Sequence, residues 1–151
     1  MPLDQKFMTH LPSLFAALLA TDGPVLEIGA GMGSTPILRA YCRAAEREFV
    51  SVESEKKWAE AMDVMYDEDY STLPTLAKGK WSVVFVDNAP AIRRGADATL
   101  FQDSAEYVVI HDWESWEVQQ NCAGSGWLHS RLDTRDPQTI TFSMRRRVPQ
   151  R

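Results

Sequence analysis

The chain has 151 residues, of which 44% are hydrophobic and 25% charged, and its formal net charge is −5. These values are typical of a single globular domain with a core that needs no disulfide or metal staple. The negative charge argues against a broad nucleic-acid-binding surface, which requires clustered Lys and Arg. The basic run 145–151 is the exception, and we interpret it as a solvated end of the chain.

Cysteine usage and hydropathy favour a cytoplasmic protein that does not span a membrane. Cys42 and Cys122 lie far apart, in no spacing typical of metal or redox sites. The apolar stretch 11–20 has the hydrophobicity of a secretory signal, but Pro12 interrupts it and Asp4 weakens its positive flank. We therefore expect an amphipathic packing helix there. No segment approaches the roughly 18 apolar residues of a membrane-spanning helix.

Helix and strand patterns alternate along the chain, which predicts an α/β fold. The expected architecture is a Rossmann-like, doubly wound and mostly parallel sheet with helices on both faces, formed by residues 1–151 as one domain. Expected strands cover residues 25–28, 48–52, 62–65, 81–86 and 107–110. Expected helices cover residues 3–19 within an N-terminal unit 1–22, a segment starting at 34 or 35, and residues 54–62, 91–102 and 114–121.

Two further strands close the chain, at residues 127–132 and 139–144. Asp136 and Pro137 between them are typical of a turn. The pattern therefore predicts an antiparallel hairpin over residues 127–144.

The first expected strand runs directly into three alternating glycines, Gly29, Gly31 and Gly33. Glycines let the backbone approach a ligand, and the start of the following helix offers free N–H groups. The dinucleotide fingerprint requires a third small residue where this chain has Ser34. Glu27, one of the last residues of the strand, must be hydrogen-bonded if buried, either to the loop amides or beneath a cationic ligand. A tight strand-to-helix turn in another kind of α/β protein is the alternative.

Acidic residues or histidine follow four of the expected strands: Glu27, Glu53, Asp87 and the pair His111-Asp112. Ligands of open parallel sheets bind beyond the carboxyl ends of the strands, so these side chains are expected on one rim. Glu53 follows the first glycine by 24 residues, where an acid meets the ribose hydroxyls of bound nucleotides. An exposed loop acid is the alternative for Glu53.

The order of these features resembles the class I S-adenosylmethionine (SAM)-dependent methyltransferases. The shared features are E-x-G-x-G-x-G, an acid ending strand two, Val-Asp after strand four and a terminal hairpin. The chain is similar to a group of small bacterial methyltransferase-like proteins, with matching segments Thr9-His10-Leu11-Pro12, Gly33-Ser34-Thr35-Pro36, Val86-Asp87-Asn88-Ala89-Pro90 with Arg93-Arg94, and Val109-Ile110-His111-Asp112. The resemblance implies a fold and a cofactor but no particular substrate.

The resemblance further implies that SAM binds at the rim, with S-adenosylhomocysteine as the product and no metal. Glu53 would accept the ribose hydroxyls, Glu27 would lie near the amino group of the cofactor, and an acid of 67–69 would receive the adenine amino group. The residues implied at the cofactor are Glu27, Gly29, Ala30, Gly31, Gly33, Glu53, Asp69, Asp87 and Asn88.

Methyl transfer to a hydroxyl or amine benefits from a base with a pKa near neutrality, which makes His111 the first candidate. Asp112 would orient it, and Asp87 is the alternative base. His111 could instead position a loop. His10 and Trp113 are candidate substrate contacts, with a helix-end role and core packing as their respective alternatives.

The expected function is therefore SAM-dependent methyl transfer to the O or N atom of a small molecule. Nucleic acid is disfavoured because Asp87-Asn88-Ala89-Pro90 fails to match the D/N-P-P-Y motif of DNA amino-methyltransferases. Either the acceptor binds in an open cleft or a second subunit of a homo-oligomer completes the site. A SAM-binding protein without transferase activity is one alternative. An NAD-dependent oxidoreductase is another, and Ser34 and Glu27 argue against it.

Overall fold

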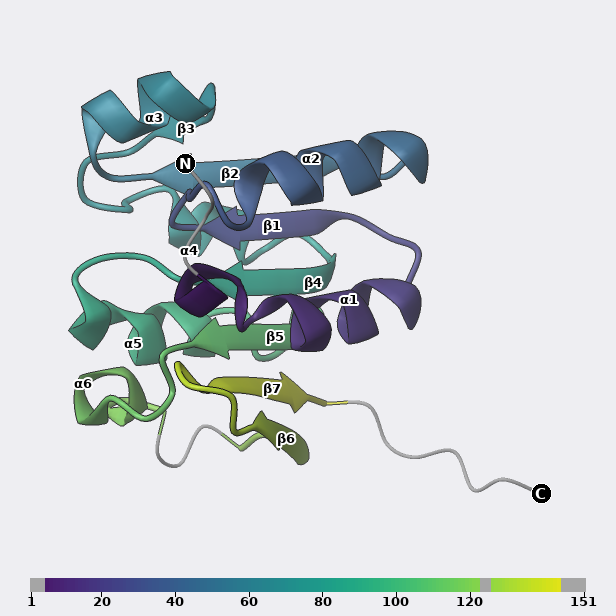
Figure 1. The fold of residues 1–151 in the computed structure, drawn as a ribbon, viewed down its shortest axis with the longest axis vertical. Coiled ribbons are helices and arrows are strands. Elements are labelled where there is room, and N and C mark those ends of the chain that lie inside the picture. Colours follow the sequence, from purple (N-terminus) through teal and green to yellow (C-terminus); the bar gives the residue numbers. More distant parts are fainter. Residues whose placement is uncertain (1–4, 123–125, 145–151) are drawn as a thin grey trace.

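The computed structural model describes residues 5–122 and 126–144 and contains one seven-stranded sheet. The strands lie in the order β3-β2-β1-β4-β5-β7-β6 (Figure 1). Their bounds are β1 Val25–Ile28, β2 Phe49–Glu53, β3 Met65–Tyr66, β4 Trp81–Val86, β5 Ala105–His111, β6 His129–Asp133 and β7 Thr139–Ser143. The first five strands pair in parallel, whereas β7 is antiparallel to both β5 and β6. The predicted α/β fold and the antiparallel C-terminal hairpin are confirmed.

Helices cover both faces of the sheet, as the alternating pattern predicted. They are η1 Gln5–Met8, α1 Leu11–Leu19, α2 Thr35–Ala44, α3 Lys56–Met62, α4 Leu73–Leu76, η2 Ala91–Arg93, α5 Arg94–Thr99 and α6 Trp116–Gln119. In β4, Val83 and Phe85 pack with α1 and α2, while Val84 and Val86 pack with α4, α5 and α6. All six residues of β4 are buried. Burial of each such apolar side chain stabilises the folded state by about 1.5–3 kcal/mol.

The strand order reverses at β1, and this reversal positions the candidate site. From β1 the chain crosses to β2 and β3 on one side, then returns to β4 and β5 on the other. Ile28 pairs in register with Val86, so the loop after β1 and the loop after β4 begin side by side. Ligands of open α/β sheets bind at such a switch point.

The N-terminal segment is not the continuous helix expected over residues 3–19. It divides into η1 and α1 at Thr9 and His10, and residues 1–4 lie outside the described part. Pro12 lies in the first turn of α1, where its missing N–H costs no hydrogen bond. The proline therefore begins this helix rather than interrupting a longer one. In Figure 1, η1 lies across the carboxyl ends of the central strands.

Other helices are shorter than expected. The helix expected from Ser54 begins at Lys56, because Glu53 binds the N–H of Glu55 and keeps the chain extended. The helix expected over 91–102 consists of η2 followed by α5. The third strand is at Met65–Tyr66, at the end of the range expected for it. The single turn of α4 was not predicted.

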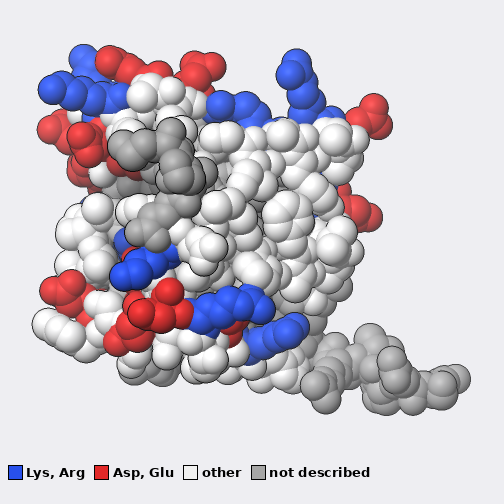
Figure 2. Space-filling model, viewed as in Figure 1, with Lys and Arg blue, Asp and Glu red and all other residues white. Residues whose placement is uncertain are grey.

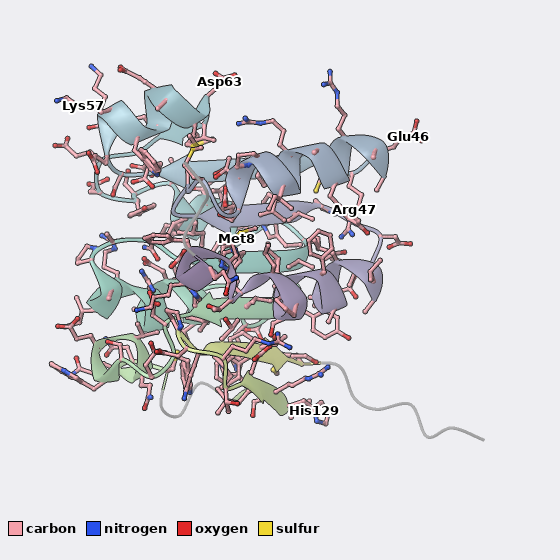
Figure 3. All side chains as sticks on the ribbon, in the orientation of Figure 1. Met8, Glu46, Arg47, Lys57, Asp63 and His129 are labelled. Atoms are coloured by element: carbon pink, nitrogen blue, oxygen red, sulfur yellow. The ribbon has the colours of Figure 1, made fainter. Side chains whose placement is uncertain are left out.

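Charged side chains of both signs lie on the surface. Figure 2 shows cationic and anionic side chains over α3 and along the lower edge of the drawn face, and a largely uncharged surface to the right of its centre. Arg47 is half-buried, and its guanidinium donates to the carbonyls of Gly23 and Leu18, which ties the end of α1 to the segment before β2 (Figure 3). No helix within the described ranges is long and apolar enough to cross a membrane. The basic run 145–151 lies outside the described residues.

Candidate functional site

The surroundings of the three glycines in the loop after β1 differ. Gly29 has φ of +90°, and a Cβ there would lie 2.5 Å from Asn88 Cα. A Cβ at Gly33 would collide with the backbone carbonyl of Phe7 in η1. At Gly31 the nearest atom to a Cβ is Ser34 Oγ at 3.8 Å, so the chain itself leaves room for a side chain there. Packing explains two of the glycines, and Gly31 keeps open space beside the backbone.

Glu27 supports the loop from below. Its carboxylate is fully buried and accepts hydrogen bonds from the hydroxyls of Ser34 at 2.5 Å, Thr35 at 2.8 Å and Ser51 at 2.6 Å. Burial raises the pKa of Glu27 to about 7, although the three hydroxyls oppose this shift. Glu27 thus has a structural role in supporting the loop, and its contact with a ligand amino group stays a prediction. Ser51, on the neighbouring strand β2, was not identified from the sequence.

Glu53 holds the same loop from the side of β2. Its Oε2 accepts the backbone N–H of Ala30 at 2.9 Å, and its Oε1 accepts the N–H of Glu55 at 2.8 Å. The residue is 8% exposed. Glu53 thus lies at the glycine loop as expected, and its contact with a ribose stays a prediction.

A cavity of about 370 Å³ lies between η1, the glycine loop, α3 and the end of β4. Its lining residues are Phe7, His10, Ala30, Gly31, Met32, Gly33, Ser34, Trp58 and Asp87. Five of them were predicted as site residues: His10, Ala30, Gly31, Gly33 and Asp87. Trp58, which donates its indole N–H to the carbonyl of Ala30, was missed because no sequence motif marks it.

Several predicted ligand contacts lie outside this cavity. Asn88 is buried and donates to Asp97 at 2.8 Å. Asp69 is exposed and accepts the N–H of Ser71, whereas Asp67 in the same loop is buried and binds Thr72. These side chains organise loops around the rim.

Trp113 is partly buried and packs against the core, and its contact with a substrate stays a prediction. Its ring packs edge-on against Phe142 with centroids 5.4 Å apart. His129 is exposed at the start of β6. It lies far from Met8 of η1 in Figure 3. It lines a separate groove of about 790 Å³ between α1 and the hairpin. That groove lacks the glycine loop and the acidic rim, so we do not assign it to the candidate site.

Three predicted catalytic residues come together at the carboxyl ends of β4 and β5. His111 Nδ1 lies 3.3 Å from Asp87 Oδ1 and 3.6 Å from Asp112 Oδ1. One donor atom from each residue lies within 4.8 Å of the others, so these three side chains could hold a metal ion. Asp112 has φ of +55°, which an aspartate tolerates better than most residues. The expectation that this site uses no metal stays a prediction.

Both ring nitrogens of His111 have partners. Its Nε2 lies 3.0 Å from Thr9 Oγ1, and the Thr9 hydroxyl donates at 2.8 Å to the carbonyl of Pro137. Since that hydroxyl proton is used, Nε2–H must donate to Thr9, while Nδ1–H faces the carboxylate of Asp87. Burial lowers the pKa of His111, but Asp87 and then Asp112 outweigh burial and leave the pKa raised. The arrangement favours an imidazolium.

His10 lies beside this cluster, and its ring is neutral near pH 7. Its ring centroid is 4.8 Å from that of Phe85 and 5.0 Å from that of His111. Burial first, and then the charge of His111, lower the pKa of His10 to about 4. The neutral ring donates from Nε2 to the carbonyl of Gly33 at 3.3 Å. His10 therefore joins η1 to the glycine loop.

Arg94 completes the cluster and was not identified as a site residue from the sequence. Its Nη1 lies 2.6 Å from Asp112 Oδ2 and 3.2 Å from Asp87 Oδ1. Its Nε donates to the carbonyl of Asn88 at 2.7 Å. The guanidinium thus links the ends of β4 and β5. Arg94 appeared in the sequence only as half of the Arg93-Arg94 pair, which does not distinguish the buried arginine from the more exposed one.

Comparison with known proteins adds no relative to this description. The chain matches no protein-family model and no curated protein sequence.

Proposed function

We propose that the chain is a SAM-dependent methyltransferase that acts on a small-molecule O or N acceptor. The observation that carries the proposal is the cavity at the switch point of the sheet. At Gly31 there is open space beside the backbone, and Asp87, which follows β4, lines the same cavity. Cavities at such positions are the usual ligand sites of open α/β sheets.

The residues present fit the proposed cofactor. The cavity of about 370 Å³ is within the range typical of small-molecule sites. Met32, Trp58 and Phe7 offer apolar surface, and Asp87 offers a negative charge to a cationic sulfonium. Ala30 and Gly31 would contact the cofactor through their backbone. Glu53 lies next to this loop, where a small rearrangement would present its carboxylate to a ribose.

The cofactor would supply an activated methyl group, so the protein has chiefly to align the acceptor with it. Positioning of this kind can contribute roughly 7–11 kcal/mol to a reaction barrier. Asp87 is the better base candidate, because it lines the cavity, whereas the two ring nitrogens of His111 already face Asp87 and Thr9. His111 and Arg94 would then orient the Asp87 carboxylate.

A SAM-binding protein without transferase activity is the second candidate. The observation that favours it is the saturation of Asp87, which pairs with both Arg94 and His111. The two candidates differ in turnover: only a methyltransferase forms S-adenosylhomocysteine from SAM when acceptors are supplied. We place either function in the cytoplasm, because neither Cys42 nor Cys122 is part of a disulfide.

Crystallisation with S-adenosylhomocysteine tests the proposal directly. We expect the ligand in the cavity, with its amino-acid part against Gly31 and its ribose beside Glu53. Density in the groove beside His129, or no density at saturating ligand, would contradict the proposal. Screening hydroxyl and amine acceptors for S-adenosylhomocysteine release then separates the transferase from the binding protein.

A further inference from the structure

We propose that Asp87, His111 and Asp112 form a set of side chains of the kind that binds a divalent metal ion. The guanidinium of Arg94 provides the positive charge at this set in place of a metal ion. In this role Arg94 is a positioning residue that holds the rim of the site together without a metal ion. The inference concerns only the chain's own side chains and stands whichever ligand the cavity takes.

The three ligand groups already face one another. His111 Nδ1 is 3.3 Å from Asp87 Oδ1 and 3.6 Å from Asp112 Oδ1, and the donor set fits within 4.8 Å. Oxygen and nitrogen atoms bound to a divalent ion at about 2.1 Å lie roughly 3 Å from their nearest neighbours in the coordination shell. The cluster therefore has the composition and nearly the dimensions of a two-carboxylate, one-histidine ligand set.

The outer partner of His111 also matches a metal-ligand arrangement. Its Nε2–H donates to Thr9 Oγ1, and the Thr9 hydroxyl is fixed in turn by the carbonyl of Pro137. Histidines that bind metals commonly donate their second N–H to such an acceptor, which sets the orientation of the ring. Here it directs Nδ1 toward Asp87 and Asp112.

The guanidinium of Arg94 occupies the position of the cation. It contacts Asp112 Oδ2 at 2.6 Å and Asp87 Oδ1 at 3.2 Å through the same nitrogen, Nη1. Its side chain is 9% exposed and is anchored by the carbonyls of Asn88 and His111. A metal ion on the same carboxylates would have to displace this buried charge. Arg94 therefore supplies a permanent positive charge where a bound ion would otherwise be needed.

Replacing Arg94 by Met should convert the cluster into a divalent metal site. The matched control is Arg93→Met, which removes the same charge from the adjacent residue. Arg93 pairs with Asp97 and lies outside the cluster. Two metal ions serve as probes. Binding of Mn²⁺ is measured by the electron paramagnetic resonance signal of the free ion, and binding of Co²⁺ by its visible absorption.

We expect Arg94→Met to bind Mn²⁺ at least tenfold more tightly than the wild-type protein, with Arg93→Met like wild type. The Co²⁺ spectrum of Arg94→Met should show protein ligands, and a second change, Asp112→Asn, should remove the gain. A variant that folds only when Mn²⁺ is present would support the same conclusion.

Three results would overturn the proposal. The first is wild-type binding of Mn²⁺ as tight as that of Arg94→Met. The second is an equal gain in Arg93→Met. The third is an Arg94→Met protein that binds no metal when folded, or that stays unfolded with and without Mn²⁺. None of these outcomes depends on SAM, so failure of this proposal is distinguishable from failure of the proposed function.

Discussion

Thr9 Oγ1 lies 3.0 Å from His111 Nε2 and joins two residues that are 102 positions apart in the chain. The contact ties the segment between η1 and α1 to the end of β5. Because the Thr9 hydroxyl also donates to Pro137, the link brings the β6–β7 turn to the same point. It requires a proton on Nε2, so it fixes which ring nitrogen of His111 carries a proton when the ring is neutral.

We predict that His111 titrates above its ordinary pKa of 6.5, because protonation is favoured by Asp87 and Asp112 despite burial. A folded-state pKa above the unfolded value stabilises the protein below pH 6.5, and this contribution is lost as pH rises through the raised pKa. Ring signals measured by NMR across this range provide the check, with Asp87→Asn expected to lower the value. A wild-type pKa at or below 6.5 would contradict the assignment.

The glycine loop yields a matched pair of substitutions. Gly31→Ala should fold with stability close to wild type, because a Cβ there meets only ordinary contact, yet it should weaken SAM binding at least tenfold. Gly33→Ala should instead destabilise the fold by about 1–3 kcal/mol, because its Cβ collides with the Phe7 carbonyl. Thermal unfolding and calorimetric titration separate the two effects. Equal losses of stability in both variants would be inconsistent with this account.

Replacing Glu27 with a neutral residue should raise the unfolding free energy by an amount that depends on pH. The pKa is raised from 4.5 to about 7, so this residue contributes most stability below pH 4.5 and loses it as pH rises through 7. Glu27→Gln keeps the shape and cannot ionise. Relative to wild type, it should gain about 1 kcal/mol of unfolding free energy between roughly pH 6 and pH 8. Denaturant unfolding at both pH values measures this difference, and a constant difference would refute the raised pKa.

Glu53 separates loop support from ribose recognition. Glu53→Ala should weaken SAM binding at least tenfold, since it removes the carboxylate and leaves the Ala30 N–H without its acceptor. Glu53→Gln keeps one acceptor oxygen where Glu53 uses two, for the N–H groups of Ala30 and Glu55, so it should lose less thermal stability than Glu53→Ala while SAM affinity still falls. Unchanged affinity in Glu53→Ala would refute the ribose role.

The sequence was sufficient where local pattern and burial coincide. The run 81–86 is apolar on both faces, and it forms β4 with the predicted bounds. The Asp136-Pro137 turn likewise gave the antiparallel hairpin. The placement of Asp87, His111 and Asp112 on one rim followed from the rule that parallel strands share their carboxyl edge.

The rest depended on contacts between distant segments, which no local pattern reveals. The hydroxyl partners of Glu27 were not predicted, because Ser34, Thr35 and Ser51 meet its carboxylate only once β1, β2 and α2 assemble. Trp58 reaches the glycine loop only because α3 folds over it. Arg93 and Arg94 are adjacent in sequence, yet only Arg94 turns into the Asp87–Asp112 pair.

Equilibrium binding of SAM, S-adenosylhomocysteine and NAD to the purified protein, measured by calorimetry, tests the central claim most directly. The account predicts submillimolar binding of SAM or S-adenosylhomocysteine and no detectable binding of NAD. Binding of NAD without binding of SAM or S-adenosylhomocysteine would contradict it.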